Sequence, residues 1–250
     1  MKVVHRIAEL ERGVGTVGLV PTMGALHAGH VALIAAARAE CDSVVVTVFV
    51  NPAQFDDDAD LAAYPRDETS DAEVAAGAGA DILFAPAVEE LYPPGFQTWV
   101  EVEQLSRVLE GAHRPGHFRG VATVCLKLFN LVRPQRAYFG QKDAQQLAVI
   151  RRMVRDLNLD VAVRAVPTVR DPDGLALSSR NSRLSPAERQ VATALPRALA
   201  TRDVEAARAA LAGVEVDYVE LADFDPPVLA AAIRVGSTRL IDNVPLEEEA

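Results

Sequence analysis

The feature that most constrains this fold is the run SVVVTVFV at positions 43–50, in which six of the eight residues are Val or Phe. A half-exposed strand alternates apolar and polar residues, whereas a near-continuous β-branched run is typical of a strand buried on both faces of a parallel sheet. The run therefore predicts an α/β architecture with a central parallel sheet.

The rest of the first two-thirds of the chain supports that architecture. Further strands are expected at 16–20, 81–84, 137–139 and 161–166, and helices at 31–40, 71–78, 121–132 and 143–157. This alternation predicts a Rossmann-like parallel sheet with right-handed crossovers over residues 1–168. Ligands in such sheets bind at the carboxyl ends of the strands, and the polar motifs described below all follow expected strands.

The pattern changes after residue 168. Asp171, Pro172, Asp173 and Gly174 form a strong turn signal, and helices are expected from about Ser185. Two short strands are expected at 218–221 and 239–241. We therefore expect residues 169–250 to form a smaller α+β lid domain.

Composition excludes several classes of function. The chain of 250 residues carries a net charge of −10, which disfavours broad nucleic-acid binding, since that relies on Lys and Arg. No apolar stretch approaches the roughly 20 residues of a membrane helix, and the first ten residues lack a signal-peptide core. We expect a cytoplasmic protein with no nucleic-acid or membrane partner, and Cys41 and Cys125 as buried, reduced thiols.

The motif PTMGALHAGH, at positions 21–30, follows an expected strand and opens a helix. His27 and His30 are three residues apart, so both lie on one face of the first helical turn. Helix N-termini bind phosphate, and two imidazoles there can stabilise charge on a triphosphate during displacement. The alternatives are an ordinary helix cap or a metal pair. No third ligand accompanies the pair, so no metal site is expected.

Four other motifs carry polar residues. Asn51 and Gln54 offer neutral amides that suit an acid with hydroxyl groups, or they belong to an unliganded loop. The segment 111–120, GAHRPGHFRG, is either a ligand-binding loop or a solvated surface turn. The segment 140–146, GQKDAQQ, places Lys142 after a strand as a charge suited to phosphate. Ser178, Ser179 and Arg180 suit phosphate oxygens, unless they form a plain polar linker.

Seven motifs in this order resemble the pantoate–β-alanine ligase family, a branch of the nucleotidyltransferases with a HIGH-type signature. They are PTMGALHAGH, FVNPAQF, YPRD, RPGHFRGVATV, KLFN, YFGQKDAQQL and DGLALSSRN, and STRLIDN resembles the last strand of the family. The resemblance implies that pantoate attacks the α-phosphorus of ATP, giving pantoyl adenylate and pyrophosphate. The β-alanine amine then displaces AMP and forms pantothenate.

The resemblance also assigns roles by position. It places ATP at Met23, Gly24, Ala25, Leu26, His27, Ala28, Gly29, His30, Gly140, Gln141, Lys142, Asp143, Val169, Leu177, Ser178, Ser179 and Arg180. It places pantoate at Gln54 and Gln146, with β-alanine also at Gln54, and it names His30 as proton donor. We expect His27, His30, Lys142 and Arg180 to act in catalysis, with Mg²⁺ arriving on ATP and the chain forming a homodimer.

Two alternatives stay open on the sequence. Another HIGH-type adenylyltransferase acting on a small acid would keep the histidine pair and ignore β-alanine. A nucleotide-sensing protein would bind ATP without turnover, but would leave the glutamines without a purpose. The chain also departs from the family, which often has Glu at the position of Gln141 and Met at that of Leu177.

Overall fold

The computed structural model describes residues 1–246 and divides the chain into two compact units. The first unit comprises residues 1–139 and 146–166, and the second comprises residues 140–145 and the chain from Pro167 onward. The second unit thus contains a short segment, 140–145, from within the first two-thirds of the chain. The last four residues of the lid domain expected at 169–250 lie outside the described residues.

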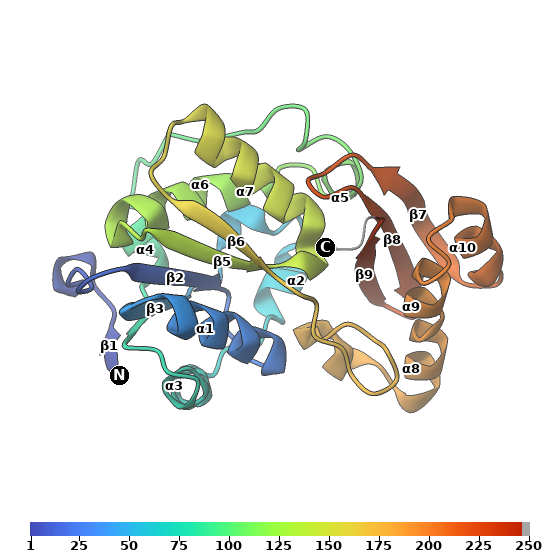
Figure 1. Cartoon of the computed structure of the whole chain (residues 1–250), viewed down its shortest axis with the longest axis horizontal. Coiled ribbons are helices and arrows are strands. Elements are labelled where there is room, and N and C mark those ends of the chain that lie inside the picture. Colours follow the sequence, from blue (N-terminus) through green and yellow to red (C-terminus); the bar gives the residue numbers. More distant parts are fainter. Residues whose placement is uncertain (247–250) are drawn as a thin grey trace. The chain divides into compact units, whose positions relative to one another are not determined.

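The first unit is built on a six-stranded parallel sheet in the order β1-β4-β3-β2-β5-β6 (Figure 1). The strands are β1 (Lys2–Val4), β2 (Val17–Thr22), β3 (Ser43–Val48), β4 (Ile82–Phe84), β5 (Arg136–Gly140) and β6 (Ala162–Val166). The helices are α1 (Ala28–Glu40), α2 (Asp58–Ala62), α3 (Glu68–Gly77), α4 (Val88–Leu91), α5 (Glu110–His113), α6 (His117–Val132) and α7 (Ala144–Asp156). The expected Rossmann-like α/β fold is confirmed.

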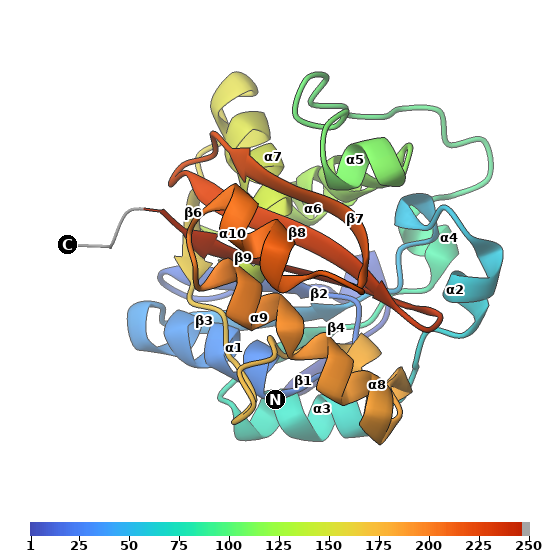
Figure 2. The same cartoon turned by 90° about the vertical axis from the view of Figure 1, so that its right-hand side faces the viewer.

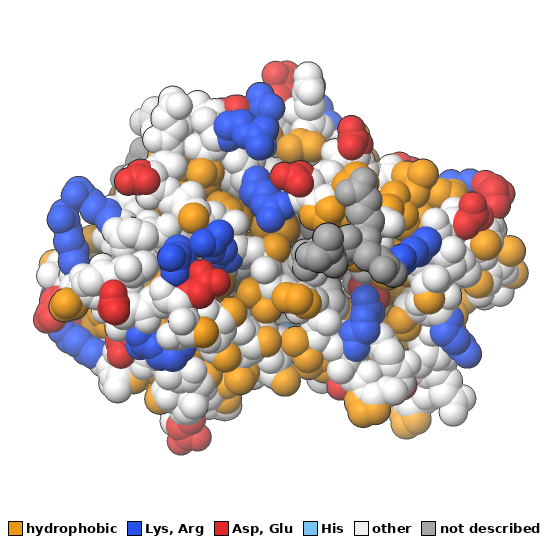
Figure 3. All heavy atoms as spheres, in the orientation of Figure 1, with side chains coloured by type: hydrophobic (Ala, Val, Ile, Leu, Met, Phe, Trp, Pro, Cys, Tyr) orange, Lys and Arg blue, Asp and Glu red, His pale blue; other side chains and the backbone are white. Residues whose placement is uncertain are grey.

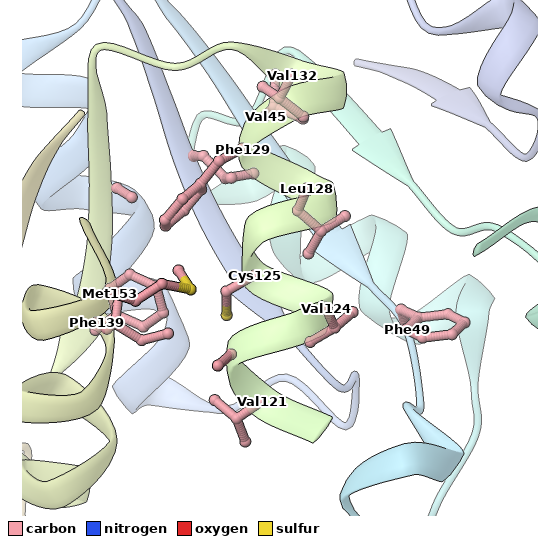
Figure 4. Packing of buried hydrophobic residues seen from close by; sticks show 14 of the residues in the cluster. Val45, Phe49, Val121, Val124, Cys125, Leu128, Phe129, Val132, Phe139 and Met153 are labelled. Carbon is pink, nitrogen blue, oxygen red and sulfur yellow. The ribbon is translucent and has the colours of Figure 1, made fainter. Parts of the chain in front are cut away.

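Strand β3 explains the apolar run from which the fold was predicted. Val44 and Val46 pack in a cluster with residues of α1 and α3, whereas Val45 packs in a second cluster with residues of α6 and α7. Figure 4 shows part of the second cluster, with Cys125 and Phe129 of α6 on the side of Phe139 of β5 and Met153 of α7. Because successive side chains of a strand point to opposite faces, a strand covered on both sides needs apolar residues at consecutive positions.

Strand β2 extends further than the sequence indicates. The sequence predicts that it ends at Pro21, but Pro21 and Thr22 continue the parallel pairing with β3. The backbone N–H of Val17 points to the β5 side, toward Gln135, and the backbone nitrogen of Pro21 faces the same way because the two positions have the same parity. Pairing of β2 with β5 covers only Gly18 and Leu19, so the missing N–H of Pro21 costs no ladder hydrogen bond.

Both cysteines are buried and free, as expected. Burial raises the pKa of the Cys125 thiol to about 12, so this thiol stays protonated at neutral pH. In Figure 4 it lies within the apolar cluster, on the face of α6 that is turned to the core. A protonated, enclosed thiol is a poor nucleophile, and Cys125 therefore acts as a small core residue.

The second unit contains an antiparallel sheet of β7 (Glu215–Ala222), β8 (Val228–Val235) and β9 (Thr238–Pro245), with β8 in the centre. Its helices are α8 (Pro186–Ala192), α9 (Ala194–Leu199) and α10 (Val204–Ala210), and Figure 2 shows α9 and α10 beside the sheet. The sequence did not indicate β8, because its segment VLAAAIRV contains three alanines, which favour helix in isolation. Burial of Ala231, Leu229 and Ile233 against α9 decides its conformation instead.

The surface mixes charges of both signs. Figure 3 shows Lys and Arg side chains interspersed with Asp and Glu side chains on one face. In the first unit, for example, Glu40 lies 3.2 Å from Arg136 and 3.3 Å from Arg164. Within residues 1–246, every helix is too short or too polar to span a lipid bilayer.

Candidate functional site

The histidine pair sits at the start of α1, directly after the loop that follows β2. His27 is the N-cap, and its Nδ1 accepts a hydrogen bond of 3.1 Å from the Gly29 N–H. His30 Nδ1 in turn accepts one of 3.2 Å from the His27 N–H, and the ring centroids lie 4.1 Å apart. This is a capping box, the reciprocal arrangement that Ser or Thr and Glu or Gln usually make. The regular helix, expected from residue 31, begins at Ala28.

The capping box determines which nitrogen of each ring carries the hydrogen. A ring nitrogen that accepts a hydrogen bond bears no proton, so both neutral imidazoles carry theirs on Nε2. Each ring is therefore set as a hydrogen-bond donor through Nε2. Two such donors at a helix N-terminus, where the helix dipole is positive, provide an electrostatic environment suited to an anion.

Asp71, a residue that the sequence analysis missed, holds the loop before the histidines. Its buried carboxylate on α3 accepts the N–H of Leu26 at 2.7 Å and that of Ala25 at 3.1 Å. Gly24 and Ala25 have φ of 84° and 51°, and a Cβ at Gly24 would lie 2.7 Å from the Asp71 carboxylate. The available signal was weak: Asp71 lies four residues before Ala75, on the buried face of a helix.

We expect Asp71→Asn to lower both stability and turnover. The amide group has the same shape, but its NH₂ would face the N–H of Ala25 or Leu26, leaving a buried donor unsatisfied at a cost of about 1–3 kcal/mol. Thermal melting and steady-state AMP release would measure the two effects. Asp67→Asn is the matched control, because Asp67 caps the same helix and Asn caps equally well. Equal effects of the two variants would exclude this role for Asp71.

Gln54 ends a 3₁₀ turn, Pro52–Gln54, that follows β3. Asn51 caps this turn through Oδ1, and its Nδ2 donates to Gln54 Oε1 at 2.9 Å and to the Gly120 carbonyl at 3.2 Å. The Gln54 amide nitrogen is thereby directed at the sulfur of Met23, 3.0 Å away. A thioether is a weak acceptor, so a substrate carboxylate would be a stronger partner for this amide.

The segment 111–120 supports the Gln54 turn rather than forming an open loop. Most of it is helical, in α5 and the first turn of α6. His117 Nδ1 donates to the Gln54 carbonyl at 2.7 Å, and Arg114 donates to the same oxygen at 3.2 Å. A Cβ at Gly120 would collide with the Ala53 carbonyl, so glycine is required where α6 meets the turn. Two basic side chains of this segment therefore contact protein backbone.

The second unit carries the remaining expected ATP residues. Gln141–Asp143 form a 3₁₀ turn directly after β5, and Lys142 Nζ lies 3.4 Å from the Asp143 carboxylate. Val169 and Leu177 are joined by a backbone hydrogen bond of 2.9 Å, from the Leu177 N–H to the Val169 carbonyl.

Ser178 caps a second 3₁₀ turn, Ser179–Arg183, by accepting the Arg180 N–H at 3.3 Å. Ser179 and Arg180 therefore lie in the first turn of a short helical segment.

The expected site residues thus fall into two sets. The first unit brings together Met23 and Gln54, and it carries the histidine pair and, in the first turn of α7, Gln146. The second unit carries the segments 140–143, 169 and 177–180.

Comparisons with known proteins identify the family. Residues 1–245 match the family model described as pantoate-beta-alanine ligase. A pantothenate synthetase from Moorella thermoacetica is 52% identical over 96% of this chain and 94% of its own, and one from Chloroflexus aurantiacus is 50% identical over 100% and 99%.

Solved structures agree. The pantothenate synthetase of Thermus thermophilus has a TM-score of 0.95 at 47% identity, covering 99% of this chain and 100% of its own. The Francisella tularensis pantoate-beta-alanine ligase, complexed with beta-gamma ATP and beta-alanine, has a TM-score of 0.86 at 33% identity, covering 100% and 99%. Full-length matches at this level show that the chain belongs to the pantoate–β-alanine ligase family.

Proposed function

We propose that this protein condenses pantoate with β-alanine at the expense of ATP. A pantoate carboxylate oxygen attacks the α-phosphorus, and pyrophosphate leaves. The amine of β-alanine then attacks the acyl carbon of pantoyl adenylate, loses a proton and displaces AMP, giving pantothenate. The observation that carries this proposal is the reciprocal cap of His27 and His30, which sets two Nε2–H donors at the start of α1.

The chemistry of each set of residues supports a division of labour. The polyanion suits His27, His30, Lys142, Ser178, Ser179 and Arg180, which are donors or cations. The Gln54 and Gln146 amides suit pantoate, because a neutral amide can bind both a carboxylate and a hydroxyl. His30 acts mainly by stabilising the charge that builds on phosphate oxygens, and no covalent enzyme intermediate is required because adenylation itself activates the acyl carbon.

Mg²⁺ would enter as part of the nucleotide substrate. Within residues 1–246, no group of three or more His, Cys, Asp or Glu side chains is placed to hold a metal ion. Mg²⁺ commonly binds through phosphate oxygens and water, with few protein ligands, so MgATP is the substrate form that fits this chain. The expected homodimer and cytoplasmic location are part of the same proposal. Light scattering and cell fractionation would test them.

The defining experiment measures AMP release from MgATP with pantoate, β-alanine, both or neither. The proposed ligase releases AMP in quantity only when both are present. Pyrophosphate release that depends on pantoate but is indifferent to β-alanine would favour an adenylyltransferase. ATP binding without turnover would favour a nucleotide sensor, and either result would overturn the ligase assignment.

Replacement of Gln54 should affect pantoate more than ATP. We expect Gln54→Ala to raise the KM for pantoate about 10- to 100-fold, the loss of one hydrogen bond to a charged group. Gln54→Glu retains the oxygen that accepts from Asn51 but places negative charge where the amide stood, so the increase should be larger. Steady-state kinetics with each substrate varied would measure this, and an increase confined to the KM for ATP would contradict the assignment.

A further inference from the structure

One side chain near the end of β9 binds two successive backbone carbonyls, those of Gln141 and Lys142. Asn243 is buried, and its Nδ2 lies 2.9 Å from the Gln141 carbonyl oxygen and 2.8 Å from that of Lys142. Carbonyl oxygens only accept hydrogen bonds, so the amide nitrogen donates both of its hydrogens. One amide group thereby fixes two successive carbonyls of the turn that carries Lys142.

Asp242, the residue before Asn243, contacts the other segment of the second unit that is assigned to ATP, residues 169–177. Asp242, 3% exposed, makes a bidentate pair with Arg170, with N–O distances of 2.6 and 3.1 Å. Arg170 also donates to the Gly174 carbonyl, and it directly follows Val169 in the chain. Bidentate Arg–carboxylate pairs restrict both distance and orientation, so the 169–177 segment is tied to β9 at this point.

We propose that Asn243 is a positioning residue for Lys142, and that the Asp242–Asn243 end of β9 aligns both ATP-binding segments of the second unit. The proposal rests on the proposed function, because Lys142 is assigned there to the phosphates. The ammonium group of lysine is attached through a flexible chain of four carbons. The position of the backbone in this turn therefore determines the region that the Lys142 charge can reach. Misplacing a reacting group by about 1 Å can lower the rate about 100-fold. Loss of the Asn243 hydrogen bonds to this turn should therefore lower the rate measurably.

A purely structural role is the competing explanation. Asn243 would then stabilise the sheet, and its loss would lower the melting temperature without a specific effect on the chemistry of ATP. The two explanations differ in a double-mutant cycle with Lys142. If Asn243 acts through Lys142, replacing Asn243 should have little further effect on kcat once the ammonium group is gone. If the two residues act independently, the fold-losses in kcat of the two single variants should multiply in the double variant.

The test compares Asn243→Ala, Lys142→Met and the double variant, each by kcat, KM, ATP affinity from calorimetry, and thermal melting. We expect Asn243→Ala to lower kcat about 10- to 100-fold with the KM for pantoate unchanged, and the double variant to match Lys142→Met alone. Asn243→Ser retains a single hydrogen-bond donor, so its kcat should lie between that of wild type and that of Asn243→Ala. It also serves as the test variant if the alanine variant does not fold.

Asp217→Asn is the matched control for sheet stability. Asp217 on β7 pairs with Arg234 at 3.1 Å and Arg239 at 2.5 Å in the same sheet. This variant should lower the melting temperature and leave kcat intact. Full kcat in a folded Asn243 variant, or multiplicative losses in the cycle, would overturn the positioning role while leaving the ligase function standing.

Failure of the proposed function gives a different result. If wild-type protein binds ATP but does not release AMP, the ligase assignment fails. The same cycle measured on ATP affinity then decides the positioning role, with non-additive losses supporting it and additive losses refuting it. Absence of ATP binding by wild-type protein would overturn both.

Discussion

Replacing His30 by Gln is expected to lower kcat about 100- to 1,000-fold while leaving the KM for ATP nearly unchanged, the effect of displacing one preorganised donor from transition-state charge. Gln at this helical position can still accept the His27 N–H, as in an ordinary capping box, so the helix start should survive. The variant therefore keeps the cap but loses the imidazole Nε2–H from its fixed place, because the Gln amide NH₂ is directed by the oxygen that accepts the His27 N–H. Steady-state AMP release with saturating pantoate and β-alanine would measure it.

Two further variants separate the cap from the chemistry. His30→Ala loses both the donor and the capping acceptor, so it should lose activity to at least the same extent and also melt at a lower temperature. His5→Ala is the matched histidine control, since His5 is exposed and pairs with Glu68 on the surface. A change confined to the KM for ATP in the His30 variants would refute the transition-state role.

Replacing Lys142 by Met is expected to lower kcat/KM for ATP about 100-fold or more. Met preserves the length and apolar stem of the side chain but removes the charge that neutralises phosphate oxygens as the bond to pyrophosphate breaks. Lys142→Arg should recover only part of the loss, because the wider guanidinium cannot occupy the place of a compact ammonium. ATP-dependent pyrophosphate release would be measured for each variant.

Lys127→Met provides the matched control for a lost lysine. The Lys127 ammonium lies 4.8 Å from the centre of the Phe96 ring and 5.9 Å from that of Tyr92, in a cation–π contact on the first unit. Its replacement should cost about 1 kcal/mol of stability or less and leave turnover unchanged. Equal losses for the two variants would show that the Lys142 effect is nonspecific.

Much of the fold was predictable because its signals are local. The run at 43–50 indicated a strand covered on both faces, and the alternation of strands and helices indicated a parallel sheet. Boundaries were less accurate. Helix α1 begins at Ala28 rather than at 31, because His27 and His30 act as caps, roles usually taken by other residue types. Strand β8 was not predicted, because its three alanines favour a helix locally and its strand conformation depends on packing against other parts of the chain.

Part of the local geometry of the candidate site was predictable too. The spacing of His27 and His30 predicted that both lie at the start of the helix, although His27 is the N-cap and not a residue of the first turn, and the amide pair of Asn51 and Gln54 was visible as a motif. The groups that support them were not visible. The basic segment 111–120 was equally consistent with a surface turn, yet Arg114 and His117 both donate to the Gln54 carbonyl, which lies 60 and 63 residues earlier in the chain.

The sequence by itself determined the parallel α/β class, the family and the chemical types available at the site, because these depend on periodicity and on residues close together in the chain. Only the tertiary structure decided how those residues are held. Asp71 lies 45 residues from Leu26, and Asn243 lies 101 residues from Lys142. A hydrogen bond across such a separation forms only after the packing of strands and helices has brought its two partners together. It therefore cannot be predicted from a local pattern in the sequence.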